Sequence, residues 1–228
     1  MKNSLKNYEN VIVNKPWGYE YLVYSNKYIG LWFLHIKKNQ QTSFHCHPKK
    51  DTGLIVLNGI IDVSFFNDIT RLSAGRKLMI RKGLFHMTKA LSKGGASIFE
   101  IETPKLKHDL VRLEDKYGRK AKPYEGKSSV VKKTSQCFYF KNPKKNTKDT
   151  HIFLNCKIYV ESITQKKNFM DIDDYENLIF LDGGIMVPQS NMLVISPGNV
   201  VIASVVKRLL STFDIVHPKT VIMIISKK

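Results

Sequence analysis

The chain of 228 residues has only three cysteines, Cys46, Cys137 and Cys156, and no long apolar run. Three unevenly spaced cysteines are too few for a disulfide framework. A membrane-spanning helix needs about 20 consecutive apolar residues, and no stretch approaches that length. The N-terminus, MKNSLKNYEN, lacks the apolar core of a secretory signal. We therefore expect a protein of the cytoplasm without a membrane span.

Acidic residues are also scarce, with 19 Asp and Glu against 37 Lys and Arg, which gives a formal net charge of +18. A basic protein concentrates anions at its surface and in its clefts. The lysines are scattered through expected loops and match no DNA- or RNA-binding motif, so nucleic acid is not the expected partner. A merely solvated basic surface is the first interpretation, an anionic small-molecule partner the second, and nucleic acid the least favoured.

Helical periodicity is scarce as well, whereas short runs rich in Val, Ile, Phe and Tyr recur between turn residues. This pattern is typical of an all-β sandwich or barrel. Strands are expected at 19–25, 30–37, 53–59, 60–66, 76–81, 87–92 and 97–104. After a polar segment at 105–126, read as a short helix or extended connector, strands are expected at 136–140, 151–160, 177–187, 192–198, 199–206 and 220–226. Two β domains are therefore predicted, 1–126 and 127–228.

Two local patterns refine this organisation. Asn58-Gly59 lies between two expected strands and predicts a tight hairpin, because both residues tolerate a positive φ. The run LIFLDGGIMV followed by MLVISPGNVV has a spacing similar to GLIVLNGIIDV followed by KLMIRKGLFH. We interpret this as an internal duplication whose second copy has lost its histidines.

Three histidines form a candidate metal site. His45 and His47 are two residues apart, and in a strand this spacing sends both side chains to one face. His86 lies about 40 residues further on, where an antiparallel strand would return it to the same interior. Three neutral imidazoles suit Zn²⁺, Fe²⁺, Mn²⁺ or Ni²⁺ and leave positions open for water or substrate. Packing without a metal is the alternative interpretation.

The surrounding residues resemble the two motifs of the cupin superfamily. In the first motif, G-x₅-H-x-H-x₃₋₄-E-x₆-G, the chain matches His45, His47 and Gly59 but has Thr52 at the position of the metal-binding glutamate. In the second, G-x₅-P-x-G-x₂-H, the matches are Gly75, Gly83 and His86, with Arg81 in place of the proline. The resemblance implies a double-stranded β-helix (jelly-roll) barrel, and a bicupin if the second, degenerate domain is a barrel too. Asp51, beside Thr52, is expected to point away from the metal.

The flanks of this region are similar to the cupin domain of type II mannose-6-phosphate isomerases. The segment KPWGYE at 15–20 resembles the opening of that domain, and DLVRLEDKYGR at 109–119 resembles its end. The similarity covers residues 11–120. It implies a phosphorylated or nucleotide-linked sugar as the substrate and a place in surface-polysaccharide or nucleotide-sugar metabolism.

Such an isomerase uses a metal to polarise the carbonyl and hydroxyl of an open-chain sugar, while a base moves a proton between neighbouring carbons. Glu100 and Glu102, which share one face of an expected strand, are candidates for the base, and His35 is a further candidate. A solvated or structurally paired glutamate is the alternative interpretation.

The sugar phosphate also requires cationic side chains, because ammonium and guanidinium groups bind phosphate through charge-assisted hydrogen bonds. The candidates are Arg81, Lys49, Lys50 and Arg76. Trp17 is a candidate to stack on the sugar ring, with packing in the core as the alternative. Tyr117-Gly118-Arg119 is expected to pack a connector turn, and the alternative is an ion pair of Arg112 or Arg119 with Glu114 or Asp115; these residues are assigned no chemistry.

Two other functions remain open at this stage. Three histidines without a carboxylate also resemble the iron site of thiol-oxidising cupin dioxygenases. The absent glutamate and the degenerate second domain are equally compatible with a non-catalytic sugar-binding or scaffold protein. In each case we expect a homodimer, because cupin barrels commonly pair through exposed strands.

Overall fold

The computed structural model describes residues 8, 11–119, 130–132, 137–143 and 148–227. In the described part of the first half all regular elements are strands: β1 Val11–Lys15, β2 Gly18–Ser25, β3 Gly30–Ile36, β4 Phe44–Cys46, β5 Asp51–Asn58, β6 Ile60–Ser64, β7 Ile69–Ser73, β8 Lys77–Ile80, β9 Met87–Ala90, β10 Ala96–Thr103, β11 Val111–Glu114 and β12 Val130–Lys132. The second half adds two helices: β13 Asp149–Phe153, β14 Cys156–Ser162, α1 Lys166–Met170, β15 Asn177–Asp182, β16 Ile185–Met186, β17 Leu193–Ile195, β18 Val200–Ile202, α2 Ala203–Thr212, β19 Ile215–Val216 and β20 Val221–Lys227.

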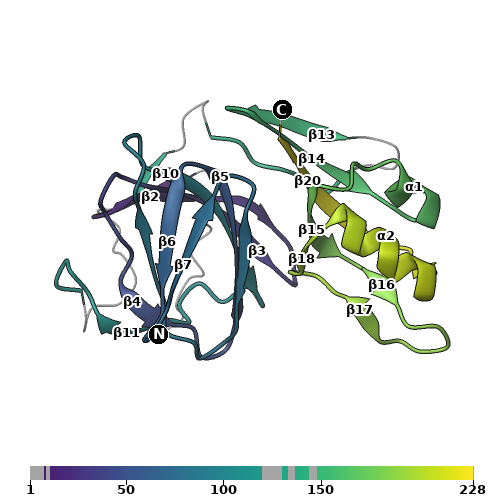
Figure 1. Ribbon diagram of the computed structural model, residues 1–228, viewed down its shortest axis with the longest axis horizontal. Helices are drawn as coiled ribbons and strands as arrows, with labels where there is room; N and C mark the ends of the chain where they lie inside the picture. Colours follow the sequence, from purple (N-terminus) through teal and green to yellow (C-terminus); the bar gives the residue numbers. More distant parts are fainter. Residues whose placement is uncertain (1–7, 9–10, 120–129, 133–136, 144–147, 228) are drawn as a thin grey trace.

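The first barrel has the strand order of a double-stranded β-helix. Its large sheet runs β12-β1-β2-β3-β10-β5-β8, and its small sheet runs β7-β6-β9. All pairs within these sheets are antiparallel, and β4 pairs separately with β11. The predicted all-β, cupin-type jelly roll is therefore confirmed (Figure 1).

The large sheet is buried on both faces. One face lines the barrel interior and carries Trp32, Leu34 and Ile98. The other face, with Phe33 and Phe99, packs on the sheet of the second half in one shared cluster. Because both faces are covered, the sequence of these strands reads as nearly continuous apolar runs instead of alternating ones.

The second half repeats the topology of the first. Its five-stranded sheet, β13-β14-β20-β15-β18, has the same connections as β2-β3-β10-β5-β8, and its three-stranded sheet, β17-β16-β19, matches β7-β6-β9. One turn is repeated as well: Gly75 donates its N–H to the Val56 carbonyl at 2.8 Å, and Gly198 donates to the Phe180 carbonyl at 2.8 Å. The second half therefore has the topology of a second, degenerate barrel, and the chain has the two-barrel architecture predicted from the sequence.

This equivalence corrects the register of the duplication inferred from the sequence. Pro197-Gly198 corresponds to Ala74-Gly75, and not to Lys82-Gly83, because Gly198 and Gly75 make the same turn before the equivalent strands β18 and β8. The first part of the alignment, which pairs the segments around Asn58 and Asp182, agrees with the structure, since β5 and β15 occupy the same place in their sheets.

Helices take the place of the histidine segments in the second barrel. Between β14 and β15, where the first barrel has β4 with His45, the chain forms α1; between β18 and β19, where the first barrel has the His86 segment, it forms α2. Phe169, Val206 and Leu210 of these helices belong to an apolar cluster with strand residues. The described part of the second barrel therefore has an apolar interior and no counterpart of the three histidines.

Several sequence predictions in the second half were wrong in detail. The run at 199–206 was expected to be a strand, but only Val200–Ile202 is extended and α2 begins at Ala203. The β-branched residues of this run are typical of a strand, but Ala203, Val206 and Leu210 have helical spacing and are buried on one face of α2. The run at 151–160 is split into β13 and β14 by a turn in which Leu154 has a φ of 51°.

Of the two interpretations of the connector, a short helix or an extended segment, the structure agrees with the second. The described part of 105–126 contains no helix, and its residues 111–114 form β11, which pairs with β4. The described residues 137–140 of the expected strand at 136–140 are not in a strand, although Phe138 and Phe140 are buried between the barrels. The predicted boundary at 126/127 lies outside the described residues, and β12, which follows it, pairs with β1.

Asn58-Gly59 is a corner between sheets instead of the predicted hairpin. β5 pairs with β10 and β8, whereas β6 pairs with β7 and β9, so the turn carries the chain from the large sheet to the small one. Gly59 has a φ of +88°, and a Cβ atom there would lie 2.6 Å from the carbonyl oxygen of Gly95. The corner therefore requires glycine for its conformation and for its space.

We expect Gly59→Ala to lower the free energy of unfolding by about 1–3 kcal/mol, because it combines backbone strain with a backbone clash. Gly75→Ala is the matched control, since Gly75 has a φ of +85° but open space around the added Cβ. Urea unfolding of both variants would measure the difference. If both variants lose the same free energy of unfolding, the clash of the added Cβ with Gly95 contributes nothing to the loss in Gly59→Ala.

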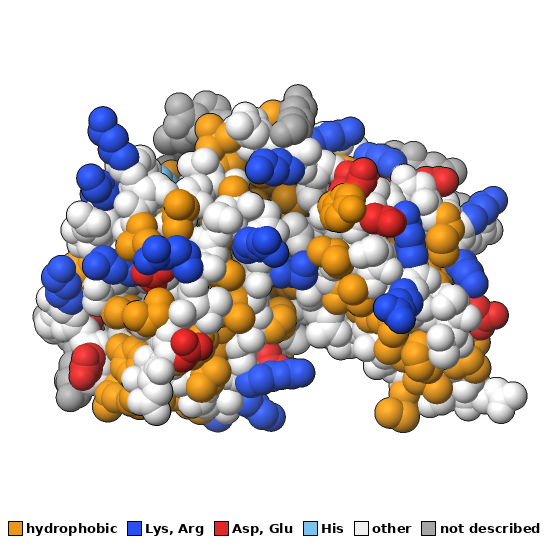
Figure 2. Space-filling view, viewed as in Figure 1, with side chains coloured by type: hydrophobic (Ala, Val, Ile, Leu, Met, Phe, Trp, Pro, Cys, Tyr) orange, Lys and Arg blue, Asp and Glu red, His pale blue; other side chains and the backbone are white. Residues whose placement is uncertain are grey.

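None of the helices in the described part of the chain has the length and apolar character that crossing a bilayer requires. Figure 2 shows Lys and Arg side chains scattered over the visible face of both barrels instead of gathered in one patch. The cytoplasmic location and the homodimer stay predictions.

Candidate metal centre

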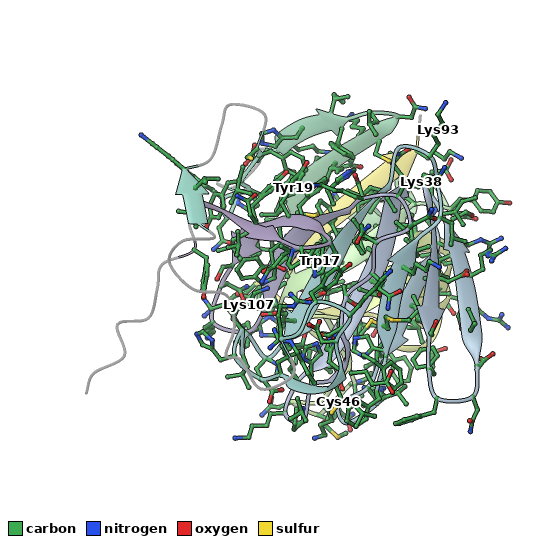
Figure 3. The ribbon with its side chains drawn as sticks, turned by 90° about the vertical axis from the view of Figure 1, so that its left-hand side faces the viewer. Trp17, Tyr19, Lys38, Cys46, Lys93 and Lys107 are labelled. Atoms are coloured by element: carbon green, nitrogen blue, oxygen red, sulfur yellow. The ribbon has the colours of Figure 1, made fainter. Side chains whose placement is uncertain are left out.

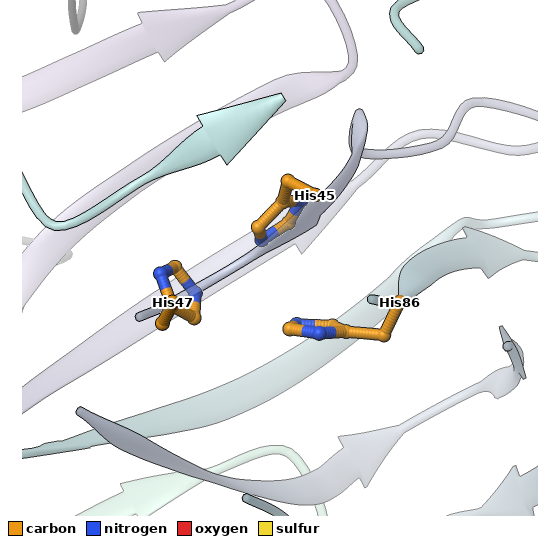
Figure 4. A group of neighbouring side chains, drawn as sticks. All are labelled: His45, His47 and His86. Carbon is orange, nitrogen blue, oxygen red and sulfur yellow. The ribbon is translucent and has the colours of Figure 1, made fainter. Parts of the chain in front are cut away.

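The three histidines come from two neighbouring segments of the first barrel. His45 lies in β4, His47 follows that strand, and His86 directly precedes β9. Two backbone hydrogen bonds, of 3.0 and 2.8 Å, join His45 to His86. One potential ligand atom of each ring lies within 4.8 Å of the other two, and all three residues are buried. Figure 4 shows the three rings converging. The structure thus brings together the three metal ligands predicted from the sequence.

Each ring is oriented by a backbone carbonyl. The Nδ1 atom lies 2.7 Å from the Ser43 oxygen in His45, 2.5 Å from the Asp109 oxygen in His47, and 3.0 Å from the Leu84 oxygen in His86. A carbonyl accepts a hydrogen bond, so these contacts place the proton of each neutral ring on Nδ1 and the lone pair on Nε2. Metal-bound histidines are commonly fixed in this way.

The environment also keeps the rings neutral. Burial lowers the pKa of His45 well below its usual value, that of His47 to about 2, and that of His86 below its usual value. The positive charge of the Lys50 ammonium group lowers the pKa of each ring further. Neutral imidazole is the form that binds a metal, so the donor set fits a divalent ion such as Zn²⁺, Fe²⁺, Mn²⁺ or Ni²⁺.

The position of the glutamate ligand in the cupin motif provides no carboxylate here. Thr52 is buried, while Asp51 accepts hydrogen bonds from the Arg81 side chain at 3.0 Å and from the Lys82 N–H at 2.8 Å. Asp51 therefore points away from Thr52, as the alternation of a strand predicts. The described residues offer a three-histidine site without an acidic ligand.

A cavity of about 470 Å³, its open mouth included, adjoins His45 and His47. Its lining is mainly polar and charged: Lys15, Trp17, Glu20, Leu34, Thr42, Ser43, His45, His47, Lys50, Glu100, Glu102, Lys107, Leu110, Arg112 and Arg119. In Figure 3 the first barrel faces the viewer, and Trp17 and Lys107 are labelled.

Buried ion pairs form one wall of the cavity. Lys50 contacts Glu102 at 2.7 Å, and Lys107 contacts Glu20 at 2.8 Å and Glu102 at 3.6 Å. Lys107 also lies 3.5 Å from the centre of the Trp32 ring. Burial by itself raises the pKa of the Glu20 and Glu102 carboxyls, but the neighbouring ammonium groups hold both values below the usual range. Both carboxylates are therefore expected to stay charged inside the barrel.

Glu100 has a different environment. It lies two residues before Glu102 on the same face of β10 and lines the same cavity. Burial raises the pKa of its carboxyl, and Lys107 and Lys50 only partly oppose that effect. A buried carboxyl with a raised pKa, in a cavity that His45 and His47 also line, is a candidate to exchange a proton with a ligand.

The remaining predicted site residues divide into two groups. Lys50 and Trp17 line the cavity with Glu100 and Glu102, and Trp17 also belongs to the apolar core of the barrel. His35 does not line it, because its ring stacks on Tyr19 at 5.4 Å and contacts Ser97, on the opposite face of the large sheet. The candidate base His35 is thus misplaced for that role.

Three candidates for phosphate binding lie outside the cavity. Lys49 and Arg76 are exposed, and the side chain of Arg81 is 79% exposed and paired with Asp51. The sequence suggested them because they adjoin the histidine motifs. Strand alternation and the outward direction of the loops place their side chains on the surface instead.

Several lining residues were missed or assigned no chemistry. Glu20 lies in the KPWGYE segment, and Arg112 and Arg119 lie in the DLVRLEDKYGR segment. Both segments were noted only as flanks of the barrel, so the signal was present but not used. Lys107 has no comparable signal in the sequence. The expected ion pair of Arg119 with Asp115 is present at 2.7 Å.

Comparison with known proteins gives matches in structure alone. No family model and no curated protein matches the sequence. KdgF from Halomonas sp. is 17% identical with a TM-score of 0.39, over 40% of this chain and 84% of that one. A cupin-2 domain containing protein from Shewanella frigidimarina is 22% identical with a TM-score of 0.35, over 40% and 83%. A conserved double-stranded β-helix protein from Klebsiella pneumoniae is 16% identical with a TM-score of 0.39, over 42% and 79%.

Proposed function

We propose that this chain is a metal-dependent cupin enzyme that isomerises or epimerises a phosphorylated or nucleotide-linked sugar. The observation that carries the proposal is the position of Glu100 in a charged cavity that is also lined by His45 and His47, two of the three neutral imidazoles. The resemblance of residues 15–20 and 109–119 to type II mannose-6-phosphate isomerases supports the choice of substrate class. A place in surface-polysaccharide or nucleotide-sugar metabolism, in the cytoplasm, belongs to the same proposal.

His45, His47 and His86 would hold the metal through Nε2, and a bound divalent ion would supply polarisation of the substrate carbonyl. Glu100, as the carboxylate, removes the proton from the carbon that bears the neighbouring hydroxyl. The resulting acid returns that proton to the former carbonyl carbon, while the hydroxyl proton passes to the former carbonyl oxygen. Return of the proton to the original carbon on its other face gives epimerisation instead.

The buried ion pairs prepare this reaction. Lys50 and Lys107 hold Glu102 as a carboxylate, and that negative charge raises the pKa of Glu100 further. A base is most effective when its pKa lies near the operating pH. Trp17, on the cavity wall, offers an aromatic surface to the sugar ring.

We expect Glu100→Gln to lower kcat by roughly 10²–10⁴-fold with little change in metal content, since an amide cannot take the proton but keeps the shape. Turnover of sugar phosphates with wild-type protein and this variant would be measured together with metal analysis. Glu161→Gln, in β14 of the second barrel, is the control. Undiminished turnover in Glu100→Gln would contradict the role of this carboxyl.

The absence of a carboxylate ligand at Thr52 favours one second candidate, a thiol-oxidising dioxygenase. Oxygen consumption with added Fe²⁺ and thiol substrates separates the two reactions, because isomerisation consumes no oxygen. Stoichiometric oxygen uptake without sugar-phosphate turnover would replace the proposed function by this one. Ligand-dependent stabilisation without either reaction would point to a binding protein.

A further inference from the structure

The segment at 109–119 completes the wall around the histidines. The Asp109 carbonyl accepts the Nδ1 hydrogen bond of His47, and β11 pairs with β4 so that Arg112 lies directly opposite His45. Residues opposite each other in an antiparallel pair have side chains on the same face, with Cβ atoms about 4.5–5.5 Å apart. The pairing therefore directs Arg112 to the side of the sheet on which His45 enters the cavity.

A tight loop then brings a second arginine to the same place. Asp115 accepts the backbone N–H of Arg119 at 2.6 Å and that of Tyr117 at 3.2 Å. Its carboxylate also contacts the Arg119 guanidinium at 2.7 Å, while the Tyr117 hydroxyl donates to Gln40 at 2.8 Å. Arg119 is only 7% exposed, and a contact of 3.5 Å joins the Arg112 guanidinium to the Arg119 carbonyl. Asp115 thus holds the Arg119 guanidinium in place, and the Arg112 guanidinium lies beside this loop.

The charges around the cavity favour an anion at these arginines. Among the described lining residues, the cations Lys15, Lys50, Lys107, Arg112 and Arg119 outnumber the carboxylates Glu20, Glu100 and Glu102. Lys50 and Lys107 contact Glu102 and Glu20, Lys15 contacts Glu20 at 3.6 Å, and Arg119 contacts Asp115, so these ion pairs leave an excess of cations in the lining. A guanidinium group binds two oxygens of a phosphate or carboxylate through its paired N–H donors, so it suits a ligand that carries one of these groups.

We propose that Arg112 and Arg119 form the anion subsite of this cavity and bind the phosphate of the ligand within reach of the histidine centre. The proposal replaces Arg81, Arg76 and Lys49 in that role. The anion subsite itself does not depend on the proposed function; only the identification of the ligand as a sugar phosphate rests on it. The KYGR turn at the end of the first barrel then has a function: it positions Arg119, and β11 positions Arg112.

Isothermal titration with inorganic phosphate, at an ionic strength kept constant with chloride, tests the subsite. We expect saturable binding to the wild-type protein and a Kd raised roughly tenfold or more in Arg112→Gln, since a charged hydrogen bond to the anion is lost. Arg112→Lys keeps the charge without the paired donors and should give an intermediate Kd. Arg81→Gln is the matched control, because this exposed arginine lies outside the cavity, and its Kd should equal that of the wild type.

The outcomes separate this proposal from the proposed function. An unchanged Kd in Arg112→Gln, or no saturable binding of phosphate at millimolar concentration to wild-type protein, overturns the subsite even if sugar phosphates are turned over. A weakened Kd in Arg112→Gln together with an unchanged Kd in Arg81→Gln supports the subsite, and it does so even if no isomerase activity is found. Circular dichroism of each variant verifies that the fold is retained.

Discussion

Replacing His86 by alanine is expected to reduce the metal affinity of the purified protein by at least about 100-fold. Losing a residue that only hydrogen-bonds to a metal ligand already costs up to about 100-fold, and His86 is itself a proposed ligand. The ring of His86 is one of three that converge within 4.8 Å, and its removal leaves two ligands on one segment. His45→Ala should have the same effect. Metal content by mass spectrometry, and a Kd from competition with a chelator, would measure the loss for Zn²⁺, Fe²⁺, Mn²⁺ and Ni²⁺.

His35→Ala provides the control for this result. His35 belongs to the same barrel, and its ring lies on the opposite face of the large sheet, against Tyr19 and Ser97. Its substitution should leave metal content and sugar-phosphate turnover unchanged. A metal content that persists in His45→Ala and His86→Ala, or that falls equally in His35→Ala, would disprove the three-histidine centre.

Breaking the buried pair of Lys50 and Glu102 is expected to have the largest effect on stability. Both side chains are only 1% exposed, and their charged atoms are 2.7 Å apart. Lys50→Met leaves Glu102 with Lys107 as its remaining ammonium partner at 3.6 Å. The loss of one member of a buried ion pair costs about 3–5 kcal/mol, because the other charge stays buried without full compensation.

The double variant Lys50→Met/Glu102→Gln should recover a large part of that loss, since neither charge then remains buried from this pair. Urea unfolding of the two single variants and the double variant would give the coupling between the residues. Asp62 and Arg71 form the control pair, because Arg71 is 67% exposed and its replacement should change stability little. If the losses of the two single variants simply add in the double variant, Lys50 and Glu102 contribute to the free energy of unfolding independently of each other.

The sequence allowed the histidine centre to be predicted because its signal is local. Two histidines at a spacing of two share a strand face in any β barrel, and the glycines around His86 fix the second segment. The same rule placed Asp51 and Thr52 on opposite sides of β5. Glu100 and Glu102 were found together on one face for the same reason.

The rest of the cavity depends on pairing between distant segments, which the sequence does not specify. Arg112 reaches the site because β11 pairs with β4, about 65 residues earlier in the chain. Arg81 lies next to the histidine motif in sequence, but its loop points outward and pairs with Asp51. In the second barrel, the β-branched residues of α2 were taken for a strand because their burial against α1 and the sheet is a tertiary effect.

The same limitation applies to how the two barrels are joined. Apolar runs such as GLWFLHIK were recognised as strands, but only the structure accounts for their second apolar face, which packs on the other barrel. Phe138 and Phe140 were expected in a strand and instead fill the space between the two sheets. Which residues meet across the interface between the barrels depends on the topology of the whole chain, so no local sequence pattern predicts these contacts.

X-ray absorption spectroscopy of the protein loaded with Zn²⁺ tests the metal centre most directly. A site built from His45, His47 and His86 gives three imidazole nitrogens at about 2.0–2.1 Å, with oxygen from water or ligand completing the coordination and no sulfur. In His86→Ala, any ion that is retained should show at most two imidazole nitrogens. A bound ion without imidazole scattering, or protein that retains no ion after removal of free metal, would contradict the account of this cavity as a metal centre.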